Sequence, residues 1–177
     1  EMRRIAKAVN FGIIYGQGAF GLSKTLGIPQ TEARSFIEKY FERFSNVPLF
    51  VEKVIGEVKE KGYISTLLGR RRYIPDIDSR NQNLRKASER TAVNSVIQGS
   101  AADIIKKAMV DIFSKLEDEK KQTKMLVQVH DELLFESPPN ELDSSIDFVS
   151  REMENAILLE VPVVVEVHSG RNWGELK

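Results

Sequence analysis

The sequence has no cysteine, a single tryptophan and only two histidines among its 177 residues. Without cysteine there can be no disulfides and no thiolate metal sites. No hydrophobic run approaches the roughly 20 residues needed to span a bilayer, and the chain does not open on a signal-peptide pattern. The composition, 41% hydrophobic and 29% charged residues, is that of an ordinary globular protein. We therefore expect a cytoplasmic protein with no membrane partner.

The sequence also lacks net charge, but its charges are unevenly distributed. Residues 1–110 hold 19 Lys and Arg against 11 Asp and Glu, whereas residues 111–177 hold 7 against 15. A basic front part favours an anionic partner such as phosphate or nucleic acid, and an acidic rear part is suited to cations or to solvent. Since the chain starts at Glu1 in the middle of a helical pattern, we expect it to be a portion of a longer protein.

Residues 2–15 have the periodicity of a helix, with two cations and two aromatic residues spaced four apart. These residues are Arg3, Lys7, Phe11 and Tyr15. Four residues turn a helix by about 400° and rise about 6 Å, so the side chains form one row at a spacing that suits neighbouring phosphates. The row could hold a triphosphate and stack on its base or sugar. An ordinary surface helix would have the same pattern.

Further helices are predicted at residues 20–26, from Thr31 to Phe44 and from Pro48 to Gly62. The segment from Tyr63 to Leu68 is typical of a strand. It is followed by a turn at Gly69 and by three arginines, which could bind a phosphate backbone or simply face solvent.

A helix from about residue 81 to 97 has a polar row that ends in amide side chains. The row consists of Lys86, Arg90, Asn94 and Gln98. Amide donors could contact the minor-groove acceptors of DNA, although an exposed helix face would look the same. We expect Gly99 to bend the chain before a second helix to Leu116, with Asp103 on the polar side of that helix.

Two adjacent acids, Asp131 and Glu132, lie between apolar runs that favour strands. The pattern predicts a tight hairpin with acid at its tip. Carboxylates beside an apolar sheet are costly unless a cation offsets them, and a metal ion is the usual one; an ordinary polar turn is the alternative. After an amphipathic helix near 142–157, we expect a strand at residues 161–167 and packing of Trp173 against the rest of the chain.

Together these motifs resemble those of family A DNA polymerases, the bacterial DNA polymerase I type. The row from Arg3 to Tyr15 resembles the nucleotide-binding motif of that family, and Val129-His130-Asp131-Glu132 resembles its third catalytic motif. The segment RTAVNSVIQGSAAD at 90–103 is similar to the helix that contacts primer-template DNA. The motifs occur in the order of the family and extend over essentially the whole chain.

The resemblance implies an α+β fold, with helical fingers at residues 1–76 and a palm portion around an antiparallel sheet at residues 77–177. It also implies that Arg3 and Lys7 bind the phosphates of a dNTP, with Lys7 taking part in catalysis. Phe11 would pack on the sugar and base, and Tyr15 would guard the templating position.

The same resemblance implies that Asp131 and Glu132 hold catalytic Mg²⁺, with two ions in the complete enzyme. The DNA-binding residues would be Arg70, Arg71, Arg90, Asn94, Gln98 and His130. A further aspartate of the family comes from an upstream motif that this chain lacks, so we expect the isolated chain to be inactive and to need the upstream polymerase chain as its partner. The alternatives are a nucleic-acid-binding module without catalysis and a nucleotide-binding regulatory domain.

Overall fold

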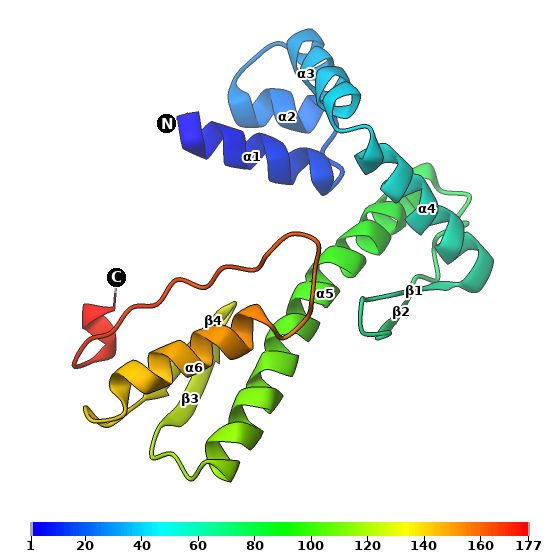
Figure 1. Cartoon of the computed structure of the whole chain (residues 1–177). Helices are drawn as coiled ribbons and strands as arrows, with labels where there is room; N and C mark the ends of the chain where they lie inside the picture. Colours follow the sequence, from blue (N-terminus) through cyan, green and yellow to red (C-terminus); the bar gives the residue numbers. More distant parts are fainter. Residues whose placement is uncertain (1, 177) are drawn as a thin grey trace. The chain divides into compact units, whose positions relative to one another are not determined.

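The computed structural model describes residues 2–176, apart from the side chains of residues 2, 4 and 8. The chain forms two compact units, one up to Ser100 and the other from Ala101 onward (Figure 1). The helices of the first unit are α1 (Met2–Ile14), α2 (Ala19–Leu26), α3 (Gln30–Arg43) and α4 (Asn46–Lys61). Its strands β1 (Tyr63–Ser65) and β2 (Arg71–Tyr73) precede α5 (Gln82–Asp118), which continues into the second unit. The second unit adds β3 (Lys124–Val129), β4 (Glu132–Glu136), α6 (Leu142–Glu154) and the short 3₁₀ helix η1 (Trp173–Glu175).

The first three helices enclose a small apolar core. Ile13, Leu22 and Ala33 are buried there, one from each helix. Because Ile13 faces this core, the row that contains Arg3 and Lys7 lies on another side of α1. The helix predictions are confirmed here, although α3 begins at Gln30, directly after Pro29 and one residue before the predicted start at Thr31.

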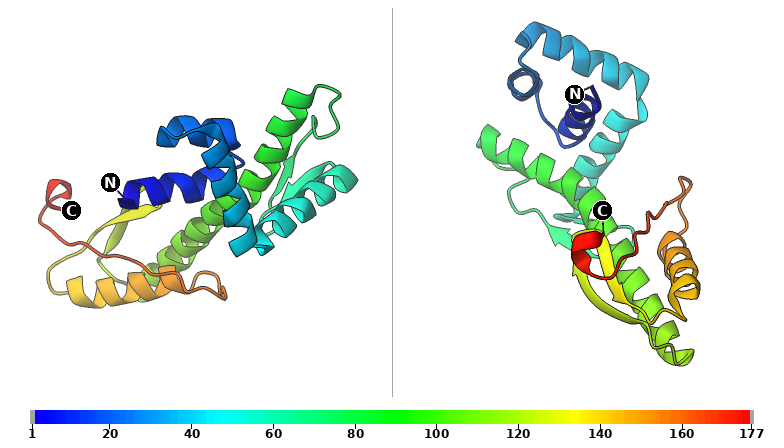
Figure 2. Two further views of the ribbon diagram at one scale, coloured as in Figure 1. Left: turned by 90° about the horizontal axis from the view of Figure 1, so that it is seen from above. Right: turned by 90° about the vertical axis from the view of Figure 1, so that its left-hand side faces the viewer.

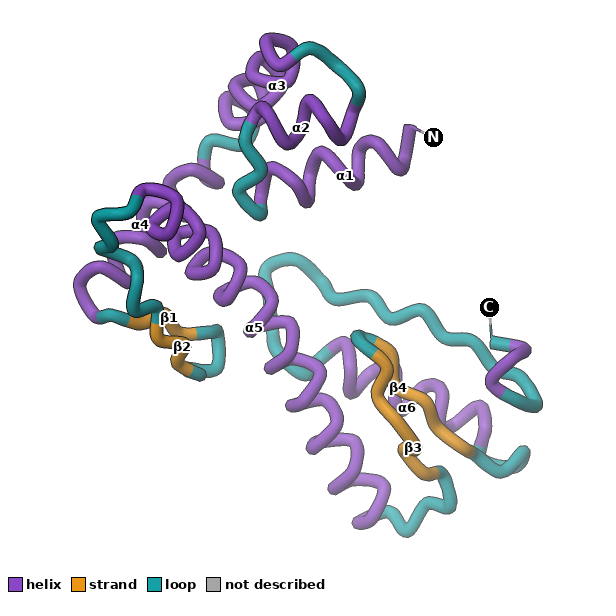
Figure 3. Tube along the Cα trace, turned by 180° about the vertical axis from the view of Figure 1, so that it is seen from behind, coloured by secondary structure: helices purple, strands orange, loops and turns teal. Residues whose placement is uncertain are grey.

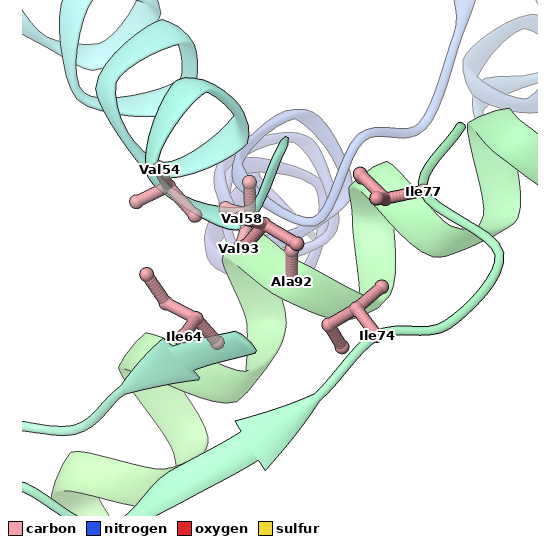
Figure 4. Packing of buried hydrophobic residues seen from close by; sticks show 7 residues of the cluster. All are labelled: Val54, Val58, Ile64, Ile74, Ile77, Ala92 and Val93. Atoms are coloured by element: carbon pink, nitrogen blue, oxygen red, sulfur yellow. The ribbon is translucent and has the colours of Figure 1, made fainter. Parts of the chain in front are cut away.

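A second core joins α4, the β1–β2 hairpin and the first half of α5 (Figure 4). Gly62, with φ +77°, ends α4 in a left-handed conformation and leads directly into β1. Tyr63 pairs with Tyr73 in the antiparallel hairpin. The core residues are Val54, Val58, Ile64, Ile74, Ile77, Ala92 and Val93. Ala92 and Val93 of α5 therefore pack with α4, although they come after residue 76. The boundary between fingers and palm at 76/77 stays a prediction.

Helix α5 continues without a break through Gly99, where we expected one helix to end and a second to begin. A Cβ at Gly99 would lie 2.5 Å from Cγ2 of Thr66, and the adjacent Leu67 N–H donates to Oγ of Ser100 at 3.0 Å. Glycine is therefore needed at this position for the close approach of the hairpin loop, and the helix does not break there.

In the second unit, the β3–β4 hairpin packs with α6 and the second half of α5 (Figure 3). The buried residues of this core are Ala108, Ile112, Leu116, Phe148 and Ala156. Asp103, expected on the polar side of α5, is only 2% exposed, so the predicted position of this residue was wrong. The predicted hairpin and the helix after it are confirmed.

The expected strand at residues 161–167 is wrong: the segment is extended loop (Figure 2). Val161 and Val164 are 75% and 77% exposed. A run of valines favours a strand, but a strand also needs a neighbouring ladder, and within residues 2–176 the only sheets are the β1–β2 and β3–β4 hairpins. Trp173, expected to pack the tail down, lies in η1 and is also largely exposed.

Candidate functional site

The four-apart residues of α1 form a continuous row in space. Arg3, Lys7 and Phe11 are exposed, and Tyr15 is half-buried. Nζ of Lys7 lies 5.9 Å from the centre of the Phe11 ring, within the range of a cation–π contact. The Phe11 and Tyr15 rings stack with centroids 5.9 Å apart and planes inclined by 22°. The row thus presents two cations and then a flat aromatic surface to solvent.

An open hollow of about 490 Å³ lies at the aromatic end of this row. It is lined by Phe11, Gly12, Tyr15, Gly16, Gln17, Gly18 and Arg90. Gly16 has φ +79°, and a Cβ there would lie 2.7 Å from Cγ of Arg90. A side chain at position 16 would therefore suffer both backbone strain and a clash. Glycine at this position lets Arg90 of α5 reach the end of α1.

Gln17 connects the end of α1 to α2, a role that the sequence did not reveal. Its Nε2 donates to Oγ1 of Thr25 at 2.9 Å, and its side chain occupies the space where a Cβ at Gly12 or Gly21 would lie. The sequence pattern predicts only that a helix ends near residue 15. The one available signal was the pair of glycines flanking Gln17.

The polar row of α5 continues from the hollow. Arg90 and Gln98 are exposed, and Asn94 between them is half-buried. The Oδ1 atom of Asn94 is buried and has no hydrogen-bond partner in the structure. An unmet buried acceptor typically costs about 1–3 kcal/mol.

The arginines of the β1–β2 hairpin are exposed. The guanidinium of Arg71 lies 4.8 Å from the centre of the Tyr63 ring, and the Tyr63 and Tyr73 rings meet edge to face at 5.6 Å. The N–H of Arg70 donates to Oγ1 of Thr66 at 3.1 Å, which steadies the turn. These contacts hold the hairpin that carries the three exposed arginines in a defined conformation.

The adjacent acids lie at the tip of the β3–β4 hairpin. Val129 pairs with Glu132, which leaves His130 and Asp131 as a two-residue turn. Asp131 and Glu132 are both exposed. Leu133 and Phe135 anchor the hairpin, because they pack on the core of the second unit. The cationic row on α1 belongs to the first compact unit, and these acids belong to the second.

A family model described as DNA polymerase family A matches residues 1–175. The chain belongs to DNA polymerase family A. It is 52% identical over 177 residues to DNA polymerase I of Bacillus caldotenax, and 51% identical over 176 residues to that of Bacillus subtilis (strain 168). These alignments cover 100% and 99% of this chain but only 20% of either polymerase.

A solved structure of the POL domain of Pol1 from M. smegmatis, in complex with DNA primer-template and dNTP, has the same fold. It superposes with a TM-score of 0.95 at 44% identity, over 99% of this chain and 31% of the other. The α+β class predicted from the sequence is confirmed by this match.

The carboxylates of Asp131 and Glu132 are chemically suitable ligands for a magnesium ion. Mg²⁺ prefers oxygen ligands and is commonly held by one or two carboxylates, with substrate phosphates and water completing the shell. Asp131 and Glu132 offer such oxygens from an exposed turn. No cluster of three or more metal-binding side chains occurs among residues 2–176, so the remaining ligands would come from substrate, water or another segment.

Helices long and apolar enough to cross a bilayer do not occur in the described part of the chain.

Proposed function

We propose that this chain is the part of a template-directed DNA polymerase that binds the incoming dNTP, contacts the primer-template and supplies two carboxylates to the catalytic centre. The observation that carries the proposal is the row on α1, in which two cations and two stacked rings follow one another on an exposed helix face. The chain spans about one fifth of the curated relatives it matches, so the activity belongs to a longer polymerase.

Arg3 and Lys7 bind the phosphates of the dNTP. Both are exposed, and the rise of about 6 Å between them matches the separation of charged groups along a triphosphate. The charge of Lys7 also offsets the negative charge that develops on the leaving pyrophosphate, which is its catalytic role.

Phe11 packs on the sugar and base of the same nucleotide, and Tyr15 stands beside the templating position. Their stacked rings border the open hollow at the end of α1. An aromatic surface of this kind binds any of the four bases through their faces and does not read sequence.

Asp131 and Glu132 hold Mg²⁺ through their carboxylate oxygens. When bound, a pair of Mg²⁺ ions supplies charge stabilisation to the attacking and leaving oxygens of the displacement. The primer 3′-oxygen attacks the α-phosphate, a new P–O bond forms, and the bond to pyrophosphate breaks. The protein contributes by positioning the reactants and by neutralising charge.

The remaining cations and amides contact DNA. Arg70 and Arg71 bind the phosphate backbone, and the terminal base pairs are contacted by Arg90, Asn94, Gln98 and His130. The exposure of Arg90 and Gln98 in one row of α5 supports this assignment.

The test is Asp131→Ala in the full-length polymerase that carries this chain. We expect turnover to fall by about 100- to 1,000-fold, as when a group that stabilises transition-state charge is removed, while the affinity for primer-template is retained. Asp147→Ala, which removes an exposed acid from α6, is the matched control and should leave turnover unchanged. Full turnover by Asp131→Ala would overturn the proposed function.

A second candidate is a nucleic-acid-binding module without catalysis. The exposed arginine hairpin and the amide row of α5 favour it, since both would serve DNA binding alone. It predicts a parent protein with DNA affinity but no primer extension, and it leaves the carboxylates at the tip of the hairpin without a role.

A further inference from the structure

The turn that carries Asp131 has an unusual backbone. His130 has φ +56°, in the left-handed region that residues other than glycine rarely adopt. Apart from Lys120, it is the only non-glycine residue with positive φ among residues 2–176. Asp131, the next residue, therefore has negative φ. In a two-residue hairpin, a positive φ followed by a negative one is the pattern of a type II′ turn.

The central peptide of this turn joins His130 to Asp131. Rotating that peptide by half a turn converts type II′ into type I′, in which both central residues have positive φ. The β3–β4 ladder tolerates either type, because both suit the twist of a hairpin. The rotation would exchange the sides of the His130 carbonyl and the Asp131 N–H, so the direction of the peptide dipole beside the Asp131 carboxylate depends on one peptide plane.

One side chain holds this peptide plane. Nε2 of Gln128 donates to the carbonyl oxygen of His130 at 2.8 Å. That oxygen belongs to the central peptide and would point to the opposite side after the rotation. Gln128 is exposed and already pairs with Leu133 through the backbone, so its side chain is not needed to close the hairpin.

We propose that Gln128 is a positioning residue that locks the His130–Asp131 peptide and so fixes the direction of the peptide dipole beside the Asp131 carboxylate. It need not touch nucleotide, metal or DNA. The role of Asp131 as a metal ligand rests on the proposed function, whereas the locking of the peptide rests on the geometry of the turn alone.

The test uses two substitutions in the full-length polymerase. Gln128→Leu removes the donor at similar size, and Gln128→Glu keeps the length but replaces the donor with a group that repels the carbonyl. The control is Gln122→Leu, the same chemical change at an exposed glutamine on the loop before β3, whose backbone N–H is what bonds Glu141.

The first measurement is a crystal structure of each variant without metal. We expect the His130–Asp131 peptide to be rotated, with positive φ at Asp131, in both Gln128 variants. The parent and Gln122→Leu should keep the present turn. This readout needs no catalysis.

The second measurement is turnover as a function of Mg²⁺ concentration. A reversed peptide dipole beside the ligand should raise the Mg²⁺ concentration needed for half-maximal turnover and lower kcat by about 10- to 100-fold, as is typical when a group that supports a metal ligand is changed. The affinity for primer-template should not change. A purely structural role would lower the melting temperature or the active fraction and leave the Mg²⁺ dependence as it was.

The rotated peptide and the raised Mg²⁺ requirement together support the proposal, and the absence of either overturns it. Asp131→Ala, measured beside these variants, separates the two hypotheses. If Asp131→Ala is inactive while the Gln128 variants behave like the parent, only the role of Gln128 is rejected. If Asp131→Ala is fully active, the polymerase site itself is rejected.

Discussion

Glu141 fastens the loop after α5 to the start of α6. Its carboxylate accepts hydrogen bonds from the N–H of Gln122 at 3.0 Å and from the N–H and hydroxyl of Thr123 at 3.2 and 3.1 Å. Partial burial raises the pKa of this carboxyl, but these hydrogen bonds and the charge of Lys121 outweigh it and hold the pKa below its ordinary value. The ionised form therefore stabilises the fold.

This lowered pKa gives stability a defined dependence on pH. The contribution of Glu141 should be complete above the pKa of about 4.3 of a free glutamate and should disappear as pH falls through the lower pKa of the folded state. We expect Glu141→Gln to lower the melting temperature at pH 7 and the difference from the parent to shrink in acid. Thermal unfolding between neutral and acidic pH measures this, with Glu160→Gln, at an exposed glutamate, as the control. A difference that stays constant across the range would contradict it.

Among the elements, α5 shows most clearly what the sequence could predict. The polar row from Arg90 to Gln98 follows from helical spacing alone, and the structure retains it. The continuity of α5 through Gly99 does not follow from spacing. The reason for a glycine at this position is the close approach of Thr66, 33 residues earlier in the chain, which local patterns cannot report.

The same distinction applies to the site. The helix that carries the row on α1 was predicted from periodicity, and the β3–β4 hairpin from the apolar runs on either side of its turn; both are local features, and both elements are confirmed. The packing of Arg90 over Gly16 and the hydrogen bond from Gln17 to Thr25 depend on how helices meet, so they became visible only in the folded chain.

The contact between Gly99 and Thr66 can be tested as a pair. Gly99→Ala should gain up to about 1 kcal/mol of helix propensity but lose about 1–3 kcal/mol by overpacking against Thr66, so we expect net destabilisation. Rotation of the Thr66 side chain is restrained, because its Oγ1 accepts from the N–H of Arg70.

Thr66→Ser keeps that hydroxyl and removes the methyl group that would clash. In the Thr66→Ser background, Gly99→Ala should therefore be neutral or stabilising. Urea unfolding of the parent, both single variants and the double variant gives the coupling free energy. Equal effects of Gly99→Ala in both backgrounds would show that the contact does not constrain α5.

At the scale of the whole molecule, we expect the proposed polymerase site to need residues from outside this chain. Residues 2–176 contain no cluster of three or more metal-binding side chains, and the resemblance to family A implies a further aspartate from an upstream motif. We expect the 177-residue chain alone to give no primer extension under conditions in which the full-length polymerase is active. Steady extension by the chain alone that disappears in Asp131→Ala would contradict this expectation.

The extended segment at residues 161–167 has a consequence for handling the chain by itself. Its exposed valines are apolar, and they lie on extended backbone that could form hydrogen bonds with a strand of a second molecule. We expect two molecules that meet along this segment to pair as strands of an intermolecular sheet. Concentrated samples of the chain should therefore aggregate. Dilution, or charged substitutions at the valines, should keep the chain monodisperse.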